Sequence, residues 1–119
     1  MNIEIPISVG ELVDKLTILE IKKEKIQDTN KLININNEYD ELTKLAIQLK
    51  NKNEEEYTKL FNELKTVNLK LWEIEDKIRI LESEKIFNEE FLELARIVYF
   101  KNDERFESKN KINKYFGSE

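Results

Sequence analysis

Polar side chains interrupt the apolar face of the helix predicted near the end of this chain. The face begins at Phe91, and Asn102, Arg105, Lys109 and Asn113 occupy it further on, at helical spacing. Because an unpaired buried cation is very unfavourable, these groups must meet carboxylates, line a cleft or bind an anion. Arg105 is suited to bidentate contacts with a phosphate or carboxylate group, and Lys109 would add a point charge.

The helix predicted over residues 54–85 carries further polar groups at the edge of its apolar stripe. Asn68 and Glu75 lie there, beside Trp72 and Arg79. Glu75 and Arg79 are four residues apart, so they are placed to pair along the helix. Trp72 offers a ring on which a ligand could stack.

The helix predicted over residues 9–28 is apolar on two faces, which favours a central position in the fold. Asp14, Thr17 and Glu20 lie between those faces and are expected to be at least partly enclosed. The two carboxylates are therefore candidate partners for the cations of the last helix.

These side chains predict a ligand-binding cleft between the first, third and fourth helices. The expected ligand is a phosphorylated or acidic small molecule, such as a nucleotide or a nucleotide sugar, with its ring on Trp72 or Tyr99. The protein would then be a binding or accessory protein. The predicted ligand-binding residues are Asp14, Glu20, Trp72, Glu75, Arg79, Tyr99, Asn102, Asp103, Arg105 and Lys109.

An enzyme is the second hypothesis. All-helical nucleotide pyrophosphohydrolases hold Mg²⁺ on carboxylates three residues apart, because such side chains project from one helix face. Glu11 with Asp14 and Glu73 with Asp76 have this spacing. In a chain with 25 acidic residues such pairs also arise by chance. No catalytic residue is assigned, and Mg²⁺ is the one cofactor that this hypothesis requires.

The third hypothesis is a structural protein in which the polar cluster is a salt-bridge network that sets helix register. Residues 2–8 alternate between apolar and polar side chains, with Ile3, Ile5 and Ile7 on one side. This pattern predicts a short extended strand. A lone strand has no partner in its own chain, so the segment would either lie extended on the helices or pair across a two-fold axis and give a homodimer.

The hydrophobic periodicity predicts an all-α fold, an antiparallel bundle of about four helices in one domain over residues 1–119. Ser8 and Glu11 form a predicted capping box, Asn53 and Asn88 are predicted caps, and Gly117 is placed as a C-terminal cap. The predicted helices, of which the last two are the long ones, span 9–28, 31–51, 54–85 and 89–116.

Composition narrows the classes of function. The chain has a net charge of −5 and contains no cysteine and no histidine, which excludes a thiolate or imidazole metal site and a Ser-His-Asp triad. The negative charge argues against binding to double-stranded nucleic acid, which needs a basic surface. No apolar run approaches the roughly 18 residues that cross a bilayer. We therefore expect a soluble cytoplasmic protein.

Three segments together resemble a family of short, uncharacterised bacterial and viral proteins, a domain of unknown function. The segments are GELVDKLTILEIK at 10–22, LWEIEDKIR at 71–79 and VYFKNDER at 98–105. Residues 30–60 match only as helix. The resemblance covers nearly the whole chain and implies an accessory role in glycan assembly, because such genes often lie among glycosyltransferase genes.

Overall fold

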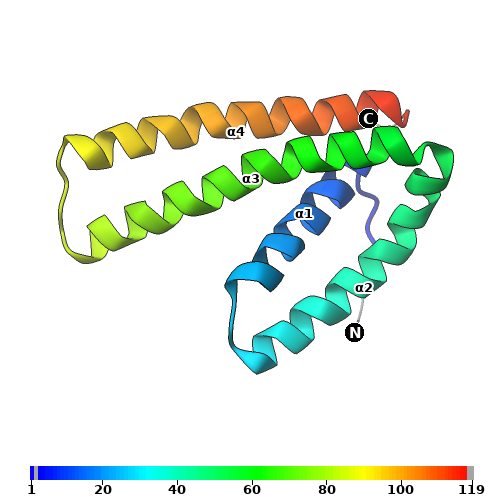
Figure 1. The fold of residues 1–119 in the computed structure, drawn as a ribbon, viewed down its shortest axis with the longest axis horizontal. Coiled ribbons are helices and arrows are strands. Elements are labelled where there is room, and N and C mark those ends of the chain that lie inside the picture. The colour runs from blue at the N-terminus through cyan, green and yellow to red at the C-terminus, as the bar shows by residue number, and fades with distance from the viewer. Residues whose placement is uncertain (2, 118–119) are drawn as a thin grey trace.

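The computed structural model describes residues 1 and 3–117, and within them the chain forms four helices and no strand. The all-α prediction is therefore confirmed. The helices form two antiparallel hairpins, and the first hairpin lies at an angle to the second (Figure 1). Helix α1 packs against all three others. The helices are α1 (Val9–Lys25), α2 (Thr29–Lys52), α3 (Glu54–Ser83) and α4 (Glu89–Tyr115).

Each helix begins where a side chain accepts a hydrogen bond from a backbone N–H of the first turn. Ser8, Asn53 and Asn88 serve as predicted, and Asp28 caps α2. Because Asp28 is the cap, α2 begins at Thr29 and α1 ends at Lys25, three residues before the predicted end.

The C-terminal ends of the long helices depend on left-handed backbone. Helix α3 ends at Ser83 rather than at residue 85, because Lys85 adopts a φ of 57° and leaves the helical conformation. Gly117 has a φ of 71°, as expected of a C-terminal cap, and α4 ends at Tyr115, one residue before the predicted end.

The main core lies where α1 and α2 meet the first half of α3 and the end of α4. Beyond it the α3–α4 hairpin extends past α1 (Figure 1), and several large apolar side chains there, among them Ile80, Phe87 and Leu92, are exposed. This division places the interior polar groups near the crossing of α1 with α3 and α4. The buried core residues are Leu12, Val13, Leu16, Ala46, Tyr57, Leu60, Leu64 and Ile112.

The predicted strand near the start of the chain does not form. The described residues before α1 have no regular secondary structure, and Ile3, Ile5 and Ile7 are 78%, 69% and 42% exposed. A strand needs a neighbour to complete its backbone hydrogen bonds, and the described part of this chain has no second strand. Pairing of this segment with a second chain stays a prediction.

None of the helices in the described chain has an apolar stretch long enough to cross a membrane.

Candidate functional site

A buried carboxylate links three helices. Asp14 on α1 is only 2% exposed, yet it faces a full set of donors. Arg105 on α4 donates from Nε to Oδ1 at 3.0 Å and from Nη2 to Oδ2 at 2.5 Å. Asn68 on α3 adds a hydrogen bond from Nδ2 to Oδ1 at 2.9 Å. The bidentate geometry makes this a strong charge-assisted pair that compensates the burial of the carboxylate.

The amide of Asn68 extends this network along α1. Its Nδ2 also donates to the Thr17 hydroxyl at 2.8 Å, and that hydroxyl donates to the backbone oxygen of Asp14 at 2.7 Å. Asn68 and Thr17 are both buried, and neither was among the predicted site residues. Asn68 lies in the apolar row of α3 between Leu64 and Leu71. A polar residue within an apolar row is the sequence feature that could have indicated its role in the network.

A second ion pair joins α1 and α4 one turn away. The ammonium of Lys109 pairs with the carboxylate of Glu11, so Glu11 is held across the helix interface. The predicted capping box forms only in part, with Ser8 Oγ accepting from the Glu11 N–H at 3.2 Å. Next to this pair the Gly10 N–H donates to Asn113 Oδ1 at 2.6 Å. These contacts bring the start of α1 against the end of α4.

Burial alone would raise the pKa of Asp14, but its partners outweigh that effect. The hydrogen bonds from Arg105 and Asn68, and the charges of Arg105 and Lys109, hold the pKa of Asp14 below its ordinary value of 3.8. The same contacts raise the pKa of Arg105, chiefly through its hydrogen bonds to Asp14. Asp14 is therefore ionised throughout the neutral and mildly acidic range.

This shift predicts a pH dependence of folding. A carboxyl whose pKa is lower in the folded state stabilises the fold above its unfolded pKa, and that stabilisation is lost as the pH falls through the folded value. Below about pH 4 the free energy of unfolding is therefore expected to fall. In Asp14→Asn, which has no carboxyl group to protonate, this part of the decrease in the free energy of unfolding is expected to be absent. Urea denaturation of both proteins between neutral and acidic pH measures it, and parallel pH curves would contradict it.

A cavity of about 200 Å³ opens beside the Asp14 network. Arg105 is 32% exposed here, and in the described chain its Nη1 and the Oδ1 of Asn68 make no hydrogen bond to protein groups. The cavity thus presents one donor edge and one amide acceptor next to a tryptophan ring. Its lining consists of Ile18, Ile21, Asn68, Leu71, Trp72, Glu75 and Arg105.

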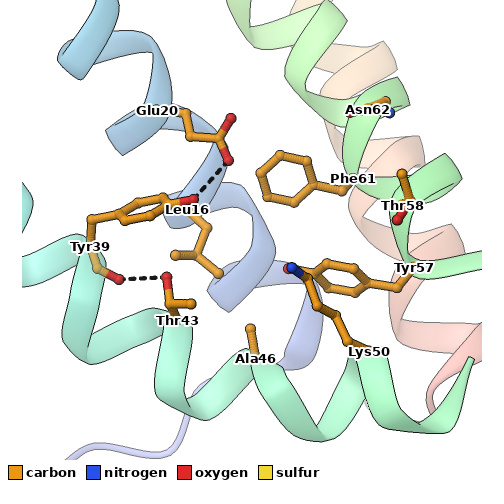
Figure 2. A pocket seen from close by; sticks show the side chains of 10 residues that line it. All are labelled: Leu16, Glu20, Tyr39, Thr43, Ala46, Lys50, Tyr57, Thr58, Phe61 and Asn62. Carbon is orange, nitrogen blue, oxygen red and sulfur yellow. Dashed lines mark hydrogen bonds between the residues drawn. The ribbon is translucent and has the colours of Figure 1, made fainter. Parts of the chain in front are cut away.

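Glu20 lies in a different cavity, of about 210 Å³, between α1, α2 and α3 (Figure 2). Its carboxylate accepts from the Tyr39 hydroxyl at 3.0 Å and from Lys65 Nζ at 3.1 Å. Burial, with the charge and hydrogen bond of Glu20, raises the pKa of Tyr39. Burial raises the pKa of Tyr57 to about 12, with smaller contributions from Tyr39 and Glu20.

The structure therefore separates Glu20 from Arg105. The ring of Tyr57 and the side chain of Phe61 point into the same space as Tyr39 in Figure 2, so this second cavity is more aromatic than the first. The sequence did not predict that Tyr39, Tyr57 and Lys65 lie near Glu20. These residues belong to other helices and approach Glu20 only when the helices pack.

Five predicted site residues line neither cavity, and one of them, Lys109, pairs with Glu11 instead. Arg79 is exposed on α3 and pairs with Asp76 at 2.9 Å instead of with Glu75. Tyr99, Asn102 and Asp103 are exposed on α4. The prediction treated one broad face of α4 as a single site, whereas successive residues turn by 100°. Arg105 therefore meets α1, while Tyr99, Asn102 and Asp103 face outward.

The described residues offer no group of three or more His, Cys, Asp or Glu side chains arranged to hold a metal ion. The pair Glu11 and Asp14 is divided between two cations, and Glu73 and Asp76 are exposed on α3. The carboxylates on which the magnesium hypothesis depends are therefore not brought together.

A family model described as a family of unknown function, DUF6165, matches residues 1–118. The chain belongs to the DUF6165 family. This confirms the resemblance at the level of an uncharacterised family. No curated protein and no solved structure matches the chain. For this DUF6165 member, function must therefore be argued from the geometry around Asp14 and Arg105.

Proposed function

We propose that this DUF6165 protein binds a small acidic molecule that carries one ring, in the cavity beside Arg105. The proposal depends on one observation: a buried aspartate holds the Arg105 guanidinium in place and leaves one edge of that guanidinium without a hydrogen-bond partner among the described residues. Asp14 occupies Nε and Nη2, and Nη1 is free to bind a phosphate or carboxylate oxygen. Asp14 then acts as a positioning residue, and Arg105 contacts the ligand.

The charges around the cavity restrict the ligand further. Asp14 neutralises Arg105, and Glu75 lines the same cavity, so the site has no large positive potential. A ligand with one anionic group and several hydroxyl groups fits this arrangement better than a polyphosphate does. Its hydroxyls would donate to Glu75 and to Oδ1 of Asn68, while Lys109 stays paired with Glu11.

The size of the cavity points the same way. A volume of about 200 Å³ is below the roughly 300–1,000 Å³ of pockets that enclose a whole drug-sized ligand. It suits one ring, lying against Trp72, with any remainder of the molecule outside. Sugar phosphates, and the sugar end of a nucleotide sugar, combine these properties. The glycan-assembly context implied by the family resemblance makes them the first ligands to test, and it agrees with the predicted cytoplasmic location.

A structural role is the competing proposal. It is favoured by the fact that the Asp14 carboxylate already has hydrogen-bond donors from the protein. Asp14 receives three hydrogen bonds from Arg105 and Asn68 with no ligand involved. A network of this kind specifies the register of α1 against α3 and α4. Under this proposal, occupancy of the cavity is incidental.

Trp72 provides a direct test, because it is the only tryptophan of the chain and it lines the cavity. We expect its fluorescence to change in titrations with sugar monophosphates or nucleotide sugars at low ionic strength. In Trp72→Leu, calorimetry with the same ligand should show a weaker affinity, because the ring surface against which the ligand lies is removed.

Two arginine variants separate ligand binding from a structural role. Arg105→Lys keeps a cation beside Asp14 but removes the spare guanidinium edge, so we expect binding to weaken while the protein stays folded. Arg79→Lys is the matched control, because Arg79 is exposed on α3 and pairs only with Asp76 among the described residues. If no ligand of the panel alters Trp72 emission, the structural role is the better account.

A further inference from the structure

Helix α4 carries two parallel rows of side chains, and only one of them is covered. Both rows alternate steps of three and four residues, the spacing with which helices pack side by side. The inner row is buried or half-buried against α3 and α1, and comprises Phe91, Leu94, Val98, Lys101, Arg105, Ser108 and Ile112. The outer row begins one residue later and is exposed as far as Phe106; this exposed part comprises Leu92, Ala95, Tyr99, Asn102 and Phe106. Beyond Phe106 the same row meets α1, where Lys109 pairs with Glu11 and Asn113 accepts from the Gly10 N–H.

The outer row contains three of the most exposed large side chains of the helix. Leu92, Tyr99 and Phe106 are 61%, 67% and 63% exposed and follow one another at seven-residue intervals. Scattered apolar side chains are ordinary on a protein surface, but an aligned set marks a contact site. With about 150–250 Å² on each aromatic side chain, the three offer on the order of 300 Å² to a partner.

We propose that this outer row is the interface of a homodimer in which α4 packs antiparallel to α4 of a second copy. The centre of the row, from Ala95 to Phe106, is complementary to itself in that direction. A two-fold axis that passes between the two helices at the level of Phe100 and Lys101 places Phe106 opposite the partner's Ala95. A large side chain then meets a small one. Tyr99 then faces the partner's Asn102, whose amide is a hydrogen-bond partner for the phenol.

Charge agrees with the antiparallel direction. Arg96 and Asp103 flank the outer row on the side away from the inner row, and both are exposed. In the described chain Arg96 has only a 4.0 Å contact with Glu93, and Asp103 has no ion pair. The two-fold axis brings Arg96 close to the partner's Asp103, twice in each dimer. A parallel pairing would leave Ala95 opposite the partner's Ala95 and produce a gap.

The apolar centre alone falls short of the roughly 800 Å² per partner of a typical stable interface. The remainder would come from polar side chains beside the row, along the length of α4. This interface does not depend on the ligand proposed above, and it differs from strand pairing through residues 3–7.

Sedimentation equilibrium of the full chain tests the proposal. We expect a mass approaching twice the 14.3 kDa of one chain as the concentration rises. Tyr99→Glu should raise the dissociation constant of the dimer at least about tenfold, because it places a charge at the centre of the apolar contact. Leu45→Glu is the matched control: Leu45 is 55% exposed but lies on α2, outside the outer row, so the dimer should persist.

Charge reversal tests the direction. Arg96→Asp and Asp103→Arg should each weaken the dimer, and the double variant should restore it. The chain has no cysteine, so a single spin label at Glu89→Cys reports the geometry directly. Antiparallel pairing places the two labels roughly 34 Å apart along the helix axis, and parallel pairing places them roughly 10 Å apart.

Three results would overturn the proposal. The first is a wild-type protein that is monomeric at every concentration. The second is a dimer that tolerates Tyr99→Glu but dissociates when residues 1–7 are removed, which would assign the contact to the extended segment. The third is a short distance between the Glu89→Cys labels, which would exclude the antiparallel arrangement.

Discussion

Arg105→Ala is expected to destabilise the fold by about 3 kcal/mol, because it leaves the buried carboxylate of Asp14 without its cation. Asp14 is 2% exposed and would keep only the hydrogen bond from Asn68. Removing one partner of a buried pair typically costs about 3–5 kcal/mol, and the partial exposure of Arg105 argues for the lower end. Urea denaturation near pH 7 measures this change.

The loss should depend on the charge left behind rather than on lost packing. Without Arg105, burial is expected to raise the pKa of Asp14. Protonation then removes the buried charge as the pH falls, so the difference in the free energy of unfolding between Arg105→Ala and the wild type should decrease. The double variant Asp14→Asn with Arg105→Ala should recover part of the stability at neutral pH. Arg79→Ala, at an exposed arginine of α3, is the control and should change little. A loss that is constant with pH and unrelieved by Asp14→Asn would contradict this account.

Gly10→Ala is the second substitution with a large expected effect. A Cβ at Gly10 would lie 2.6 Å from the backbone oxygen of Lys109 and 2.9 Å from Asn113 Oδ1. A backbone oxygen on α4 cannot rotate away, so α1 and α4 would have to separate. Overpacking of this kind costs about 1–3 kcal/mol. The Gly10 N–H would also lose its hydrogen bond to Asn113, which is worth about 1 kcal/mol more.

Asn113→Ala separates these two contributions. It removes the side-chain acceptor alone and should cost about 1 kcal/mol. The double variant Gly10→Ala with Asn113→Ala should stay as unstable as Gly10→Ala, because the contact with the Lys109 oxygen persists. Thermal or urea unfolding of the three variants gives the comparison. If Gly10→Ala changes the free energy of unfolding by less than about 0.5 kcal/mol, the close approach of α1 and α4 is wrong.

Both substitutions act at contacts between α1 and α4, which the sequence could suggest but not assign. The apolar spacing showed that Arg105 and Lys109 lie on or beside a packed face, and that Asp14 is enclosed. Several carboxylates had the right type to pair with them. Which carboxylate meets which cation depends on how the helices cross, so only the structure pairs Asp14 with Arg105 and Glu11 with Lys109.

Helix α4 shows the limit of reading a face from spacing. Tyr99, Asn102 and Arg105 fall within one broad sector of a helical wheel, and the prediction treated them as one site. Their neighbours differ, because Arg105 lies in the row that α1 and α3 cover, whereas Tyr99 and Asn102 are exposed. A rotation of 100° per residue is enough to move a side chain from the interior to the surface.

The secondary structure was determined almost entirely by local sequence. Ser8, Asn53 and Asn88 cap helices where their side chains accept from the backbone three residues on, and such contacts need no information from elsewhere in the chain. The composition likewise excluded imidazole and thiolate chemistry. The tertiary structure alone decided which polar groups share a cavity, because Asp14, Asn68 and Arg105 come from three helices and meet only once those helices pack.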